Sequence, residues 1–147
     1  MDMMKLRRMV MAQMARGKDF ITGTFTCPDS DTSFTIEFGK TFNNYLFLIE
    51  MTDAQKTALV NSGSSASLSI AFTGVYAKRS INNVNVAGNT LCHRYKASDG
   101  TQTSSSTSNL TCGTTSIKNN VRQTSASNPH INFIRGYSYN FIVVSLD

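Results

Sequence analysis

Residues 45–51 read YLFLIEM, and the residues that follow them read TDAQ. A nearly continuous apolar run of this length is typical of a central strand of a sheet. Thr52, with Gln55 three residues later, matches a capping box, in which two side chains satisfy the first backbone N–H groups of a helix. Gly63 follows at the distance expected of a helix-ending glycine. The stretch therefore predicts a central strand followed at once by a helix of about two turns over residues 53–61.

Two shorter alternating segments precede this run. Residues 20–27 read FITGTFTC and residues 33–38 read SFTIEF, so apolar and polar side chains alternate in both. Alternation with a period of two is typical of a strand with one buried face. The intervening Pro28 and its Asp and Ser neighbours form a turn sequence. These segments predict two strands joined by a short turn.

The C-terminal half continues the same pattern. Residues 67–73 alternate strictly, and Tyr76 continues that strand past a bulge at Gly74. Further strands are predicted at residues 91–97, 110–117 and 137–146. Two polar connections separate them, namely residues 98–108, which indicate an exposed loop or hairpin tip, and residues 119–128. Short strands at this spacing predict a mainly β protein, with an antiparallel β-sandwich or jelly-roll-like domain over residues 19–147.

The composition narrows the function classes. Ser, Thr and Asn supply 48 of the 147 residues, and only 16% of the residues are charged. Nine Phe and five Tyr provide large side chains for a core, which argues against disorder. No apolar run approaches the roughly 18 residues that a membrane span needs. With nine carboxylates and two His, the chain offers little for general acid–base chemistry, and a non-enzymatic protein is expected.

Residues 1–18 form a basic, Met-rich arm that differs from the rest of the chain. They carry a net charge of +4 of the total +5, so the basic charge does not spread over the whole domain. Apolar residues at helical spacing, flanked by Met4 and Met11, predict a helix of about 14 residues that ends at Gly17. The candidate assembly or anchoring residues are Met3, Leu6, Arg7, Arg8, Val10 and Met14. The helix either packs on its own domain or pairs with copies of itself or with a larger particle, and a protein is favoured over nucleic acid as the partner.

Residues with catalytic or metal-binding chemistry are few. Cys27, Cys92 and Cys112 are odd in number and lack Cys-x-x-Cys spacing, which favours free thiols in a protein made in a reducing cytoplasm, although one disulfide pair remains open. Cys92 and His93 are neighbours on a predicted strand and point to opposite faces, so they do not form a metal site or a nucleophile–base pair. A buried structural cysteine and an exposed histidine are expected instead. No catalytic, cofactor or metal residue is predicted.

Four tyrosines are candidates for surface binding. Tyr76 and Tyr95 lie near basic residues, while Tyr137 and Tyr139 lie close to the last strand. If these rings are exposed, they can stack on the faces of sugar rings, so we expect them to form a candidate glycan-binding surface.

Three motifs carry a resemblance to a known family. They are KLRRM at residues 5–9, TFNNYLFLIEMT at residues 41–52 and GYSY at residues 136–139. They resemble small virion structural proteins of phages and prophages of Gram-positive gut bacteria. The resemblance covers most of the chain and implies a phage structural protein with a β-rich body, made in the host cytoplasm and carried on the virion. It implies no active-site residue.

On this basis we expect a homotrimeric short fibre, or a tail-tip or receptor-facing component, anchored by its N-terminal helix to other virion proteins and facing a host glycan or receptor. The alternative is a capsid decoration or head-fibre protein. A bacterial surface adhesion module is a third hypothesis, and a small hydrolase that uses Cys92 or His93 is the fourth.

Overall fold

Strand β3 (Asn44–Met51) lies inside the larger of two sheets, between β9 (Ser138–Ser145) and β4 (Ser67–Lys78). Tyr45 and Phe47 are buried on one face of β3, and Leu46 and Leu48 are buried on the other. Successive side chains of a strand point to opposite faces, so this strand is covered on both sides. That double coverage explains why its sequence is apolar almost without interruption.

The computed structural model describes residues 3–30, 33–63, 67–78, 85–96, 101–106, 110–119 and 133–147. Within them it contains two helices and nine strands. The elements not yet named are α1 (Met3–Ala15), β1 (Phe20–Thr26), β2 (Phe34–Glu37), α2 (Asp53–Asn61), β5 (Asn85–Lys96), β6 (Gln102–Ser106), β7 (Leu110–Cys112) and β8 (Ser116–Asn119). The larger sheet has the order β1-β9-β3-β4-β5-β6, the smaller has the order β2-β8-β7, and every pairing is antiparallel.

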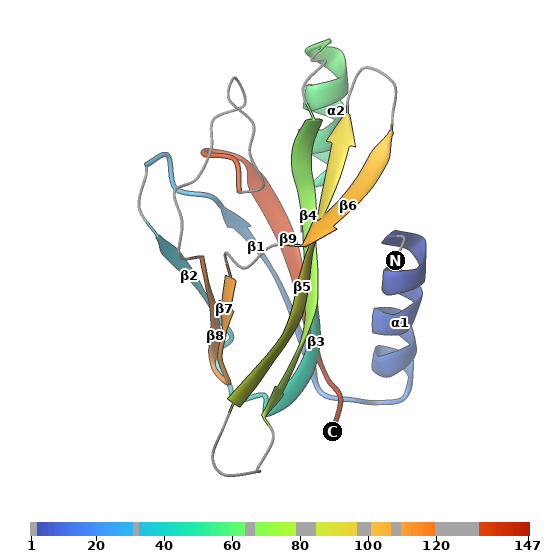
Figure 1. Ribbon diagram of the computed structural model, residues 1–147, viewed down its shortest axis with the longest axis vertical. Helices are drawn as coiled ribbons and strands as arrows, with labels where there is room; N and C mark the ends of the chain where they lie inside the picture. The colour runs from blue at the N-terminus through green and yellow to red at the C-terminus, as the bar shows by residue number, and fades with distance from the viewer. Residues whose placement is uncertain are drawn as a thin grey trace.

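The chain forms layers, with the six-stranded sheet in the middle (Figure 1). The three-stranded sheet packs against one face, and α1 packs against the opposite face over β3 and β9. The protein is therefore mainly β, with two antiparallel sheets, an N-terminal helix and one short internal helix, as the sequence predicted. Among the described residues, neither helix is long and apolar enough to cross a membrane.

Aromatic rings fill the space between the two sheets. Phe133 stacks on Phe72 with ring centroids 4.1 Å apart and meets Phe34 edge-on at 5.2 Å. Phe25 stacks on Tyr139 at 5.6 Å. Such pairs add specific geometry to the burial of large apolar surfaces. Because the five rings come from separate parts of the chain, this cluster joins the edge strand β1, the small sheet and the centre of the large sheet.

The local signals for helices and for the bulge are confirmed. The side chain of Thr52 accepts a hydrogen bond from the backbone N of Gln55 at 3.3 Å, and α2 has the predicted bounds. Helix α1 is followed by Gly17 at a φ of 73°, where a residue without Cβ is least strained. The register between β4 and β5 shifts between Gly74 and Tyr76, at the predicted bulge.

Two predicted segments differ from the structure. Residues 110–117 form two strands instead of one, because residues 113–115 turn the chain and pair Cys112 with Ile117. Residues 98–108, expected as a loop or hairpin tip, contain strand β6, which pairs with β5. Strand β5 also begins earlier than predicted, at Asn85. The polar connection at residues 119–128 lies, except for Asn119, outside the described residues.

Candidate functional site

Helix α1 is fixed to its own sheet by its inner side. Val10 is only 1% exposed and belongs to the core, and Met14 packs against that core from a half-buried position. The two residues are four apart, so they lie on one side of the helix. The helix ends with backbone bonds from Gly17 N to Met14 O and from Lys18 N to Gln13 O. Val10 therefore anchors the arm to the domain.

A carboxylate beneath the helix joins three elements. The guanidinium of Arg7 on α1 forms an ion pair with Glu50 on β3, and Lys56 Nζ on α2 lies 2.5 Å from the same carboxylate oxygen. The Glu50 side chain is largely shielded, so this charge is screened less by solvent than a surface pair. The triad of Arg7, Glu50 and Lys56 therefore links α1, β3 and α2 through one carboxylate.

An open apolar pocket of about 180 Å³ lies where α1 meets the sheet. Val10 and Met11 line it from the helix, Leu48 and Ile142 line it from the sheet, and the Arg7–Glu50 pair completes it. The helix thus covers the sheet without closing this side completely.

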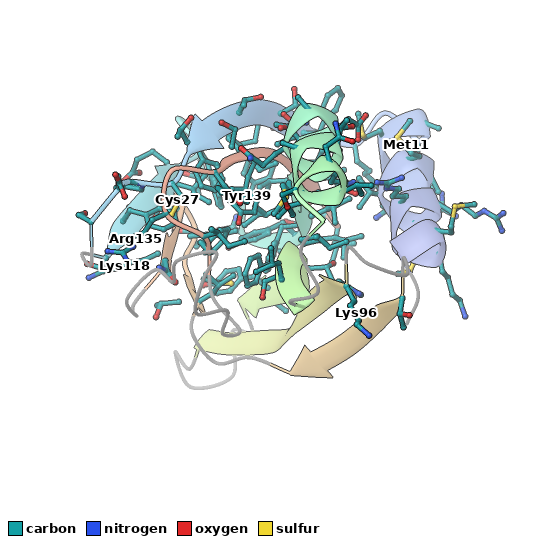
Figure 2. All side chains as sticks on the ribbon, turned by 90° about the horizontal axis from the view of Figure 1, so that it is seen from above. Met11, Cys27, Lys96, Lys118, Arg135 and Tyr139 are labelled. Carbon is teal, nitrogen blue, oxygen red and sulfur yellow. The ribbon has the colours of Figure 1, made fainter. Side chains whose placement is uncertain are left out.

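The outer side of α1 carries exposed methionines. Met4 is 62% exposed, Met11 is 58% exposed, and Met9 on another flank is 41% exposed. Met4, Arg8 and Met11 are spaced by four and then three residues, so they form one line along the helix, which we call the methionine stripe. Figure 2 shows Met11 on α1 at one side of the molecule, well separated from Tyr139. Large exposed apolar side chains grouped in this way are typical of interaction surfaces.

The structure divides the predicted anchoring residues between two sides of the helix. Arg7, Val10 and Met14 face the sheet, whereas Arg8 is exposed. The side chains of Met3 and Leu6 lie outside the described residues. Of the apolar residues predicted from the helical spacing, Val10 and Met14 pack on the chain's own sheet. The flanking residues Met4 and Met11 are exposed. Which side of the helix is exposed depends on where the neighbouring sheet lies, and the sequence of the helix does not reveal it.

The expected tyrosine surface is wrong at two positions. Tyr76 and Tyr139 are fully buried, since each lies on the face of the large sheet that the small sheet covers. Tyr76 stacks on Tyr45 with centroids 5.1 Å apart, and the Tyr139 hydroxyl accepts a hydrogen bond from Ile134 N at 3.1 Å. Tyr137 is half-buried, and the side chain of Tyr95 lies outside the described residues. These rings therefore form no common exposed surface within the described part of the chain.

The buried titratable groups are held in their neutral forms. His93 is buried, which corrects the expectation of an exposed histidine, and this burial lowers its pKa. Burial raises the pKa of Cys27 to about 12 and that of Cys112 to about 11, so both are thiols near neutral pH. Both cysteines are free. A thiol in this state is a poor nucleophile and a poor metal ligand.

The described ranges contain no group of three or more His, Cys, Asp or Glu residues that is placed to hold a metal ion. Comparison with protein-family models, with curated proteins and with solved structures gave no match. Among the described residues, the methionine stripe on α1 is the candidate docking site that the geometry defines.

Proposed function

We propose that the chain is a non-catalytic structural component of a phage particle, attached to another virion protein through the methionine stripe. The observation that supports this is the two-sided character of α1. Its inner side is anchored by Val10, while Met4 and Met11 remain more than half exposed on a helix that is held in place. A rigid helix that presents flexible apolar side chains suits docking into a groove, because methionine adapts to an imperfect fit.

The charge of the arm favours an acidic rim around that groove. Arg8 lies between Met4 and Met11 in the stripe, and the first 18 residues carry +4 of the net charge of +5. A protein groove with an apolar floor and acidic edges matches this pattern of charge and apolar surface.

Two placements on the particle follow from the proposal. In the first, the chain is a homotrimeric fibre or tail-tip component whose β domain faces a host receptor or glycan. In the second, it is a capsid decoration protein. The packing of α1 on its own sheet supports the second placement. Val10 is already buried within a single copy and needs no neighbouring copy to cover it.

The test is the protein content of particles released by bacteria that carry the gene. Purified particles are analysed by mass spectrometry, with the wild-type gene or with Met4→Glu and Met11→Glu combined. We expect the wild-type chain in the particles and the double variant to be missing from them, although its melting temperature is unchanged. Met9→Glu, on another flank of α1, is the matched control and should be incorporated normally.

Two outcomes would contradict the proposal. Absence of the wild-type chain from purified particles would refute the virion role. Normal incorporation of the double variant would refute the methionine stripe as the attachment surface. Sedimentation of the purified chain then separates the placements, since a homotrimer favours the fibre and a chain that forms no trimer on its own favours decoration.

A further inference from the structure

Strand β1 forms one edge of the six-stranded sheet, and β9 is the only strand in the described part of the chain that is hydrogen-bonded to it. Backbone bonds at both ends establish which groups face β9: Ser145 N donates to Asp19 O at 2.8 Å, and Cys27 N donates to Tyr137 O at 2.8 Å. In an antiparallel pair, hydrogen-bonded positions alternate with positions that are not bonded. The odd-numbered residues of β1 therefore bond to β9. The backbone N–H and C=O groups that point away from the sheet belong to Phe20, Thr22, Thr24 and Thr26.

This edge lacks the features that normally prevent strands from pairing between molecules. Protein edge strands are usually interrupted by charges, prolines or bulges, or they are very short. β1 contains neither a charged residue nor a proline, and its seven-residue register with β9 runs without a shift. Each of its residues is at least partly exposed, and Phe20 is 42% exposed. By contrast, the edge strand β2 has four residues and carries Glu37, and β7 has three.

The sequence of β1 is suited to pairing with itself. It reads FITGTFT, which is close to a palindrome about Gly23. If two copies run antiparallel about an axis at Gly23, Thr22 of each copy lies opposite Thr24 of the other, and Ile21 lies opposite Phe25. Pairs of threonines, and of an aromatic with a β-branched residue, are favourable across strands. Each residue then has its partner within the same seven residues, which indicates that the occupant of this edge is a second copy of the chain.

The hydrogen bonds agree with that register. Pairing about Gly23 places even-numbered residues opposite even-numbered residues, which are the ones whose backbone groups point outward. We propose that two copies of this chain associate through their β1 edges, centred on Gly23, and so join their six-stranded sheets into one. All four outward-facing residues of each copy then gain both of their missing backbone partners. This proposal does not depend on the methionine stripe, which lies on a helix.

At the axis of the proposed pair there is no room for a side chain, and Gly23 has none. A Cβ placed at Gly23 would lie 2.5 Å from two ring atoms of Phe141, so the ring occupies the space of a side chain. In the proposed pair, Gly23 faces Gly23 at a position without hydrogen bonds, where Cα atoms approach to about 4.5 Å. The two missing side chains leave room for both Phe141 rings beneath the joined sheet.

The experiment uses sedimentation of the full chain together with backbone hydrogen exchange over a range of concentrations. Thr24→Pro removes an outward-facing N–H and leaves the bonds to β9 intact, a substitution that edge strands tolerate. Thr24→Ala is the matched control, because it loses the same side-chain bond to Asn140 but keeps the N–H. We expect a dimer whose dissociation constant rises at least about tenfold in Thr24→Pro and changes by less than about threefold in Thr24→Ala.

Hydrogen exchange identifies the surface directly. The amides of Thr22 and Thr24 should exchange slowly at high concentration and rapidly on dilution, while those of Ile21 and Gly23 stay protected at both because they face β9. A monomer at all concentrations, with rapid exchange at Thr22 and Thr24, would overturn the proposal. The proposal would also be overturned by an oligomer that persists in Thr24→Pro and whose wild-type form shows no concentration-dependent protection of the Thr22 and Thr24 amides. That result would place self-association elsewhere on the chain. Neither result bears on the particle incorporation test of the methionine stripe.

Discussion

Replacement of Val10 by Asp tests whether the N-terminal helix is an integral part of the domain. Val10 is 1% exposed and lies with Leu48 at the junction of α1 and β3, close to Glu50. The variant must either place a second carboxylate beside Glu50 in apolar surroundings or release α1 from the sheet. Relative to the wild type, the released state loses the burial of the Val10 side chain and exposes Leu48, and full burial of each aliphatic side chain is worth about 1.5–3 kcal/mol. We therefore expect a loss of about 3–6 kcal/mol in the free energy of unfolding.

Val10→Ala should have a smaller effect. It removes two carbons at about 0.8 kcal/mol each, and because the site borders an open pocket of about 180 Å³ it creates no new sealed cavity. Met9→Asp is the matched control, since it puts the same charge on the neighbouring exposed position and should change stability by less than about 1 kcal/mol.

Urea unfolding measures these differences, and tryptic cleavage in the arm reports release of the helix. Val10→Asp should be cleaved rapidly after Arg7, Arg8 and Arg16, while Met9→Asp should be cleaved like the wild type. Equal stability and equal cleavage of the two Asp variants would refute the conclusion that Val10 anchors the arm.

Two further predictions concern buried polar groups. Burial raises the pKa of Cys27 from 9.0 to about 12 and that of Cys112 from 9.0 to about 11. As the pH rises, the two thiols therefore lose their protons at a lower pH in the unfolded chain than in the folded one. The contribution of the two thiols to the free energy of unfolding is therefore fully present below pH 9 and falls as the pH rises toward their pKa values in the folded chain. The total loss is about 3 kcal/mol at about pH 10. Urea unfolding at pH 8 and pH 10 under reducing conditions checks this, and Cys27→Ala with Cys112→Ala should remove most of the pH dependence; a wild type equally stable at both pH values would contradict the burial. Tyr139→Phe leaves the buried N–H of Ile134 without its acceptor and should cost about 1–3 kcal/mol in the same assay, whereas unchanged stability would show that this N–H finds another partner.

Features with local causes could be predicted from the sequence. The capping pair of Thr52 and Gln55 and the glycine after α1 act within a few residues, so the helices needed no information about the rest of the fold. The alternation in β1 and the apolar run of β3 likewise reflect one strand and its immediate faces.

Features that depend on distant partners could not be predicted in the same way. Residues 102–106 are polar and lack a strong strand pattern, but β5 offers them a backbone edge. The turn at residues 113–115 contains a glycine and two threonines, and only the pairing of Cys112 with Ile117 reveals the hairpin. The tyrosines illustrate the same limit. Alternation shows which residues share a face of a strand with Tyr76 or Tyr139, but it does not show which of the two faces a second sheet covers.

The two proposed surfaces differ in chemistry, and that difference determines what each contributes to an assembly. The methionine stripe contains Arg8, so an acidic partner is attracted to it over a distance and that attraction weakens as salt is added. The β1 edge carries no charge, so its association depends on backbone hydrogen bonds and on cross-strand contacts of Phe20, Ile21 and Phe25, which salt screens little. Under the two proposals, the chain binds its own copy and a different partner through independent contacts. Two copies joined at β1 present two methionine stripes, and simultaneous attachment through both strengthens a contact that is weak in a single copy.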